Sequence, residues 1–256
     1  MIGTVLAAVP LAVACGTAEE NHPPAATSAV SSRSAASSSP GDAAPTSENA
    51  SSTPIRFDYQ PLWPFGSAAD AATWQQAYRA GGHQPWHLAA DQVAQTFTRD
   101  YLGYRNVDKI VKTDVREDEA RVSVGFDNPS GMTATAAVVH LARYGTGADA
   151  PWEVVGTEDT TLTLTTPSYG AAITSPLTVG GRITGADESL RVQVRRSDLS
   201  QPAGEVSGIP AGGTNSPWTV TVPLTDACPG TLTIAVATGG HTAPVERFAV
   251  TGAHCS

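Results

Sequence analysis

The sequence predicts an α+β chain with two folded regions: helices with an antiparallel sheet over residues 55–168, then an all-β sandwich over residues 171–256. Two observations carry this prediction. In the first region, apolar side chains recur at four-residue spacing and then change to two-residue spacing. Beyond residue 171 only the two-residue period remains, and Gly and Pro interrupt it at short intervals. Helices with strands therefore give way to strands alone.

Two helices are expected at the start of the first region. Ser67-Ala-Ala-Asp70 has the form of a capping box, which predicts a helix over residues 67–80 that stops at Gly81-Gly82. A second helix is predicted over residues 89–102, because three aromatic or branched side chains recur there at four-residue spacing: Val93, Phe97 and Tyr101.

A run of four strands follows the helices. The alternation predicts strands over residues 107–115, 120–126, 134–144 and 152–156. Their short connections are typical of an antiparallel meander, and a meander preceded by helices makes a compact α+β domain. In the order of its elements, this region resembles the cystatin-like or nuclear-transport-factor-like superfold.

The second region consists of short strands only. Strands are predicted over residues 177–184, 190–196, 218–224, 232–238 and 245–250, with weaker signals at 172–175 and 204–206. About seven short strands separated by Gly and Pro turns are typical of an immunoglobulin-like sandwich.

Several segments of this second region also carry a family resemblance. They are Ser175-Pro-Leu-Thr-Val-Gly180, Gly185, Leu190-Arg-Val-Gln-Val194, Pro217-Trp218 and Gly230-Thr-Leu-Thr-Ile234. Together they resemble the bacterial spore-germination immunoglobulin-like domain. The resemblance implies an actinobacterial lipoprotein, in which such a domain follows a membrane tether, and it implies no catalytic residues. A role in spore germination does not follow from the fold.

The amino terminus predicts export. Residues 1–14 form an apolar stretch that leads into Cys15; the stretch is too short to cross a bilayer and fits a signal peptide. Small residues flank Val13 directly before the cysteine, which resembles the lipobox of bacterial lipoproteins. The resemblance implies that the Cys15 thiol is lipidated and becomes the mature amino terminus. The alternative is an ordinary export signal with an incidental cysteine.

Residues 15–54 predict a disordered tether. They consist mostly of Ala, Ser, Pro, Thr and Gly, and such a segment cannot bury enough apolar area to offset its ordering entropy. We therefore expect an exported protein that is anchored to the outer face of the cell membrane by lipid, with its folded regions held away from the membrane by the tether.

Charge limits the partners. The net charge of -9 argues against a nucleic-acid partner, which requires a basic face to neutralise phosphates. Lys109 and Lys112 are the only lysines, so the sequence has no lysine-rich patch for a membrane surface. Membrane attachment is therefore expected through the lipid anchor.

The two remaining cysteines predict a disulfide. Cys228 lies just before the 232–238 strand and Cys255 just after the 245–250 strand. If these strands pair as an antiparallel hairpin, the start of one adjoins the end of the other, and disulfides persist in exported proteins. The alternative is two free thiols.

Catalytic and metal-binding motifs are not found. His83 and His87 have a spacing that would suit a metal on a helix, but Pro85 between them predicts a loop. The sequence lacks a Gly-x-Ser-x-Gly elbow, a phosphate loop, a His-Glu-x-x-His pair and a dinucleotide fingerprint. We therefore expect no cofactor, no metal, no catalytic residue and no enzyme activity.

Most of the aromatic side chains fall within residues 55–104. They can simply fill the core of a small α+β domain, or some can line an exposed groove, in which case the candidates are Trp63, Trp74 and Trp86. The sequence thus predicts a non-catalytic binding or scaffolding role in the cell envelope, with an envelope protein, peptide or glycan as partner. The alternative is an envelope enzyme, or an accessory protein of one, with its site in the 55–168 region.

Overall fold

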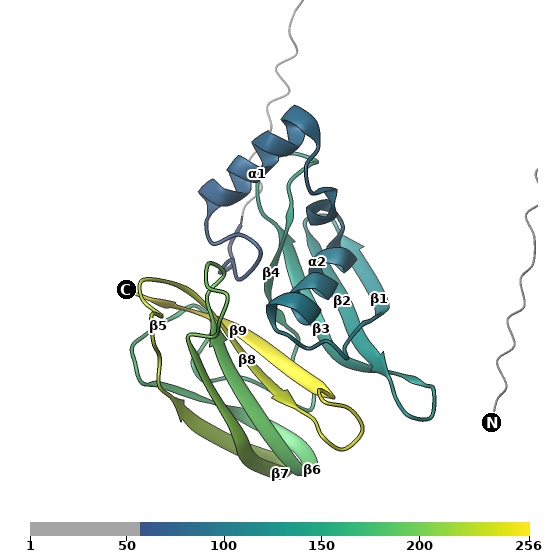
Figure 1. Ribbon diagram of the computed structural model, residues 1–256, viewed down its shortest axis with the longest axis vertical. Coiled ribbons are helices and arrows are strands. Elements are labelled where there is room, and N and C mark those ends of the chain that lie inside the picture. Colours follow the sequence, from purple (N-terminus) through teal and green to yellow (C-terminus); the bar gives the residue numbers. More distant parts are fainter. Residues whose placement is uncertain (1–56) are drawn as a thin grey trace, which may run out of the picture. The chain divides into compact units, whose positions relative to one another are not determined.

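The computed structural model describes residues 57–256, apart from the side chain of Asp187, and these residues belong to one compact unit. The fold is rich in β-structure, with two sheets and few helices (Figure 1). Within the described residues, no helix has both the length and the apolar character that crossing a bilayer requires. The predicted signal segment, the predicted lipidation site at Cys15 and the predicted tether lie outside the described residues.

The first predicted helix is present as α1, Ala68–Gly81. Ser67 caps its amino terminus, where the Ser67 Oγ accepts a hydrogen bond from the backbone N–H of Asp70 at 3.2 Å. Gly82 ends the helix in the left-handed conformation, with φ of 73°, and its N–H is bonded to the carbonyl of Tyr78. The capping box and the glycine pair thus set both ends as predicted.

The second predicted helix, residues 89–102, consists of two parts: α2 (Ala90–Thr96) and a π-helical turn that continues it, η2 (Phe97–Tyr101). A 3-10 turn, η1 (Pro85–Leu88), precedes α2. At the junction the Thr98 hydroxyl donates to the carbonyl of Ala94 at 2.8 Å. From Phe97 the backbone follows the wider π-helical pattern.

The first sheet is the predicted antiparallel meander. Its strands are β1 (Lys109–Arg116), β2 (Glu119–Asp127), β3 (Thr133–Arg143) and β4 (Trp152–Thr157), and they pair in the order β1-β2-β3-β4. Helix α2 covers one face of this sheet (Figure 1). The buried core beneath it includes Val93, Phe97, Val122, Leu141 and Val154.

The second sheet contains the remaining strands. They are β5 (Ala171–Ile173), β6 (Leu177–Arg195), β7 (Gly204–Val222), β8 (Gly230–Thr238) and β9 (Arg247–Cys255). Their order is β5-β9-β8-β6-β7. The short strand β5 is parallel to β9, and the other neighbours are antiparallel.

In two places, a pair of strands predicted as separate forms one long strand in the structure. Residues 177–184 and 190–196, predicted as separate strands, belong to β6, and residues 204–206 and 218–224, also predicted as separate, belong largely to β7. The ladder between β6 and β7 shifts its register on both sides of Gly185. Bulges of this kind bend a strand without ending it, so the Gly-containing segment that looked like a turn is a bend inside β6.

The connector from β4 to β5, residues 158–170, lies alongside β6. Leu162 bridges to Ile183, and Thr166 bridges to Gly180. A Cβ at Gly181 would lie 2.0 Å from the carbonyl oxygen of Thr163, so only glycine permits this close approach. The predicted boundary between the two regions, at residues 168–171, falls at the end of this connector.

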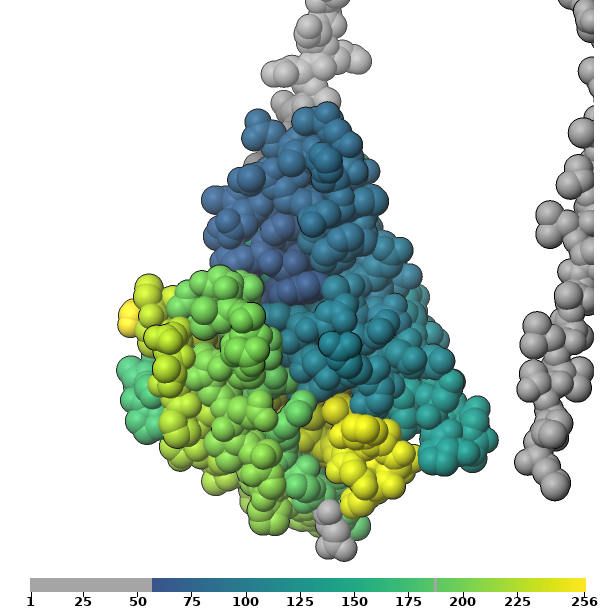
Figure 2. Space-filling model, viewed as in Figure 1, coloured from purple at the N-terminus to yellow at the C-terminus, as the bar shows by residue number. Residues whose placement is uncertain are grey.

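The two sheets share part of one core. Side chains of β8 and β9, including Ala235, Phe248 and Val250, belong to the same buried cluster as α2 and the first sheet. In Figure 2 yellow atoms from the carboxyl-terminal end of the chain lie against blue and teal atoms of the first region. Asn106 exchanges two hydrogen bonds with the backbone of Val245, in the turn between β8 and β9. The predicted regions therefore pack as parts of one unit.

Candidate functional site

A pocket of about 280 Å³ opens where the first sheet meets β9, and we call it the inter-sheet pocket. Three rings line it, those of Tyr59, His140 and Tyr169. Backbone and side chains of β4, of the connector and of β9 complete the wall: Val155, Gly156, Thr157, Asp159, Leu164, Ala249, Val250 and Thr251. The residues come from five separate parts of the described chain.

The approach of β4 to β9 forms the floor of the pocket. Thr157 Oγ1 accepts a hydrogen bond from the N–H of Val250 at 2.8 Å. At Gly156, where φ is 153°, a Cβ would lie 3.4 Å from the carbonyl oxygen of Val250. The distance alone would admit a Cβ, but this positive φ is rarely adopted by other residues, so the backbone conformation at the β3–β4 bulge is what favours glycine.

Tyr169 is held at the pocket by the segment that precedes α1. Its hydroxyl accepts a hydrogen bond from the N–H of Gln60 at 2.8 Å and donates one to the carbonyl of Gln60 at 3.2 Å. The Tyr169 hydroxyl thus both donates and accepts a hydrogen bond within the protein. The ring itself is 45% exposed, and it is one of the few large apolar or aromatic side chains at the described surface.

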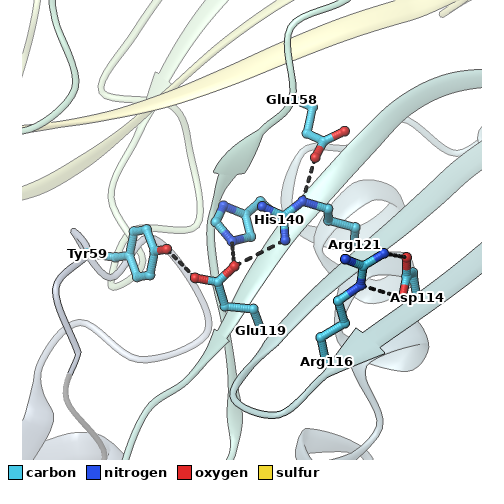
Figure 3. A network of polar contacts seen from close by, with 7 residues as sticks. All are labelled: Tyr59, Asp114, Arg116, Glu119, Arg121, His140 and Glu158. Atoms are coloured by element: carbon cyan, nitrogen blue, oxygen red, sulfur yellow. Dashed lines mark hydrogen bonds and ion pairs between the residues drawn. The ribbon is translucent and has the colours of Figure 1, made fainter.

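A polar network adjoins the pocket on the exposed face of β2 and β3 (Figure 3). Tyr59 donates to Glu119 Oε1 at 2.5 Å, and Arg121 Nη1 donates to Glu119 Oε2 at 3.1 Å. His140 Nε2 lies 3.4 Å from the same Oε2 atom. Arg121 Nε donates to Glu158 at 2.5 Å, so one guanidinium serves two carboxylates.

The charges in this network have definite states at neutral pH. The hydrogen bond from Tyr59, and then that from Arg121, lowers the pKa of Glu119 below its usual value. Burial, and then the charge of Arg121, lowers the pKa of His140. The hydrogen bond to Glu119 raises the pKa of Tyr59. Glu119 is therefore ionised, His140 is a neutral imidazole and Tyr59 is a neutral phenol.

Asp159 differs from the other carboxylates at the pocket. Its side chain is exposed, and within the described part of the chain no hydrogen bond or ion pair is formed by it. Glu119 and Glu158 are both held by Arg121. Asp159 is therefore the carboxylate at this pocket whose charge is available to a ligand.

The three tryptophans predicted as a binding surface are packed to different degrees. Trp74 is 8% exposed, in a small cluster with Phe65 and Ala71. Trp63 and Trp86 are half-buried and stack with ring centroids 5.6 Å apart. Both also pack against the main core, so the aromatic side chains serve packing first. Whether the uncovered faces of Trp63 and Trp86 bind a partner stays a prediction.

The predicted cysteine pair lies at disulfide distance. Cys228 and Cys255 have Cα atoms 5.0 Å apart. In the antiparallel ladder of β8 and β9, Cys255 pairs with Gly230, two residues beyond Cys228. The hairpin argument from the sequence thus brings the two residues together.

The histidines at residues 83 and 87 do not share a site. His83 is exposed, while His87 is 4% exposed and stacks on Trp86 with centroids 3.6 Å apart. Among the described residues, no group of three His, Cys, Asp or Glu side chains has the arrangement of a metal site.

Sequence reasoning did not find the inter-sheet pocket. The alternation in β2 and β3 contains a signal for part of it, because Arg121 and His140 are direct partners in the ladder and point to one face. Nothing local indicates that Tyr59, Tyr169 and β9 join them, since these contacts depend on how the two sheets pack.

Comparisons with known proteins give no relative. No protein-family model matches the chain, and no match was found among curated proteins or among solved structures.

Proposed function

We propose that this chain is a lipid-anchored protein of the cell envelope with a non-catalytic binding role, and that the inter-sheet pocket is its binding site. The pocket itself is the observation that carries the proposal, because it combines aromatic walls with a few polar groups that have fixed positions. Ligand sites in proteins commonly have this composition. A scaffolding role toward an envelope protein, peptide or glycan is compatible with the same surface.

The state of the polar groups favours binding over catalysis. The hydroxyls of Tyr59 and Tyr169 are both engaged in hydrogen bonds within the protein. No serine, cysteine or lysine is among the described residues that line the pocket. The hydroxyl of Thr157, which does line it, is engaged with the backbone of Val250. Such a site can orient and hold a ligand with little rearrangement of its own groups.

Two further features support the location and the finer fold that we propose. The Cys228–Cys255 pair suits a protein that folds outside the cytoplasm. The helix-covered meander is compatible with a cystatin-like domain, and the long, bent strands β6 and β7 are compatible with an immunoglobulin-like sandwich that resembles the spore-germination family. Lipidation at Cys15 in an actinobacterial cell belongs to the same proposal.

One observation favours the alternative, an envelope enzyme or an accessory protein of one. Glu119 Oε2 lies 3.4 Å from His140 Nε2, without a hydrogen bond between them, and a carboxylate–imidazole pair of this kind can tighten into a general base when a substrate binds. The lowered pKa of His140 keeps the imidazole neutral, as a base requires. The pocket would then hold the substrate.

Fragment screening by NMR distinguishes the two functions. The full chain, with tyrosine rings labelled with ¹³C, is screened against small polar compounds, and Tyr59→Phe and Tyr169→Phe variants assign the two ring signals. Binding predicts that some compounds shift both signals and are recovered unchanged after prolonged incubation. Chemical conversion that is lost in His140→Gln would support the enzyme, and the lack of any shift would contradict a binding site here.

Detergent partitioning of the full chain, compared with Cys15→Ser, tests the anchor.

A further inference from the structure

The inter-sheet pocket has an electrostatic character that indicates the charge of its ligand. The carboxylates of Glu119, Glu158 and Asp159 lie in or next to it, and the guanidinium of Arg121 lies beside them. Arg121 forms ion pairs with Glu119 and Glu158. Asp159 is left without an ion-pair partner in the described part of the chain, so the local balance is negative.

No positive side chain lies among the described residues that line the pocket itself. His140 is the one lining residue that could become cationic, and its lowered pKa leaves it neutral at physiological pH. A positively charged ligand would therefore meet no like charge from the lining, and an anionic ligand would face Asp159 without compensation.

The aromatic walls favour the same kind of ligand. Tyr59 and His140 meet edge to face, with centroids 5.1 Å apart and an interplanar angle of 82°. Tyr169 also lines the pocket, is fixed by its two hydrogen bonds to Gln60 and is 45% exposed. Tyrosine rings held in fixed positions, together with a carboxylate, are the groups that proteins use to hold ammonium ligands.

We propose that the inter-sheet pocket binds a small organic cation, an amine or a quaternary ammonium group, with Asp159 as counter-ion and the rings of Tyr59 and Tyr169 as walls. This inference rests on the proposed binding function and adds the chemical class of the ligand. The volume of about 280 Å³ suits a headgroup-sized molecule more than a folded partner.

Two matched pairs of probes separate charge from shape: choline with its uncharged carbon isostere dimethylbutanol, and butylamine with butanol. Binding to the full chain is measured by titration of the ¹³C signals of the Tyr59 and Tyr169 rings. We expect each cation to bind at least about tenfold more tightly than its neutral partner, because the neutral partner lacks the attraction of Asp159 and of the ring faces.

Variants test the roles of the residues. Asp159→Asn should weaken the binding of both cations at least about tenfold and leave the binding of their neutral partners unchanged. Asp100→Asn removes an exposed carboxylate that does not line the pocket and serves as the matched control. Tyr169→Phe keeps the ring and should retain most of the binding, whereas Tyr169→Ala should lose it. Thermal melts of each variant establish that it is folded.

The outcomes distinguish failure of this inference from failure of the proposed function. Equal binding of cations and neutral partners, unaffected by Asp159→Asn, would overturn the ligand class and leave the pocket as a binding site. If neither class of probe moves the two ring signals, and the wider fragment screen also fails, the binding site itself is overturned.

Discussion

The carboxylate of Glu153 is fully buried, and its Oε2 atom accepts a hydrogen bond from the backbone N–H of Phe65 at 3.1 Å. Its other oxygen has no hydrogen-bond partner among the described residues. Desolvation raises the pKa of Glu153 well above its usual value, and the bond from Phe65 offsets this only in part. Glu153 therefore links the strand β4 to the chain before α1 through a carboxyl group that resists ionisation.

This burial makes folding stability depend on pH. Because the pKa of Glu153 is higher in the folded than in the unfolded state, its contribution is fully present below the unfolded value of about 4.5 and is lost as pH rises toward the folded value. Glu153→Gln removes the titration. We expect the variant to lose less stability than the wild type between pH 5 and pH 8, because its side chain has no proton to lose.

Urea unfolding at several pH values measures this difference. Glu205→Gln, which neutralises an exposed glutamate on β7, is the control and should follow the wild-type curve. Parallel curves for Glu153→Gln and the wild type would show that Glu153 does not titrate differently in the folded state.

His87 should make the folding stability depend on pH in the opposite sense, with a loss at low pH. Burial lowers its pKa from 6.5 to about 4, and its ring lies among Phe65, Trp74 and Trp86. As pH falls below 6.5, the unfolded chain takes up a proton that the folded chain does not, so the folded state loses stability until about pH 4. His87→Phe keeps an aromatic ring and removes this titration. The loss of unfolding free energy that it avoids should reach about 2 kcal/mol by pH 5.

The measurement compares unfolding free energies of wild type and His87→Phe from pH 8 to pH 4. The difference between the two should grow only below about pH 6.5. His83→Phe, at an exposed position just before η1, provides the matched control. A constant offset over the whole range would mean that the imidazole is accessible to protons in the folded protein.

The parts of the fold that sequence predicts are those with local causes. The helix α1 begins at a capping box and ends at a glycine pair, and both signals lie within a few residues of the structure that they produce. The meander is likewise readable, because alternation identifies each strand and short turns require antiparallel neighbours. The pairing of Cys228 with Cys255 followed from one such hairpin.

The parts that sequence did not predict depend on distant contacts. Gly185 looks like a turn residue, and only the ladder with β7 makes it a bend within a longer strand. The pocket requires Thr157 to meet Val250, 93 residues later in the chain, and no local pattern encodes that meeting. The tryptophans are conspicuous by residue type and are therefore the site residues that the sequence predicts, whereas His140 and Tyr169 come together only through packing.

The pair Cys228–Cys255 should stabilise the β8–β9 hairpin. The two residues are 27 apart, and closing a loop of this size contributes roughly 3–4 kcal/mol in the chain-entropy model. Reduction, or replacement of both cysteines by alanine, should lower the unfolding free energy by this amount in a chain that also carries Cys15→Ser. An unfolding midpoint that does not respond to reduction would contradict a disulfide at this position.

The tryptophans provide the last prediction, because their burial differs. Trp74 is 8% exposed and stacks on Tyr78, whereas Trp63 and Trp86 are half-buried. Trp74→Ala should therefore cost about 3–5 kcal/mol of stability. Its indole nitrogen has no hydrogen-bond partner, so Trp74→Phe should recover most of that loss. Alanine at Trp63 or Trp86 should cost less, since part of each ring already faces solvent. Thermal and urea unfolding of the four variants measure this order. Near-wild-type stability for Trp63→Ala and Trp86→Ala would instead mean that these rings contribute little to packing. It would favour the prediction that they contact a partner.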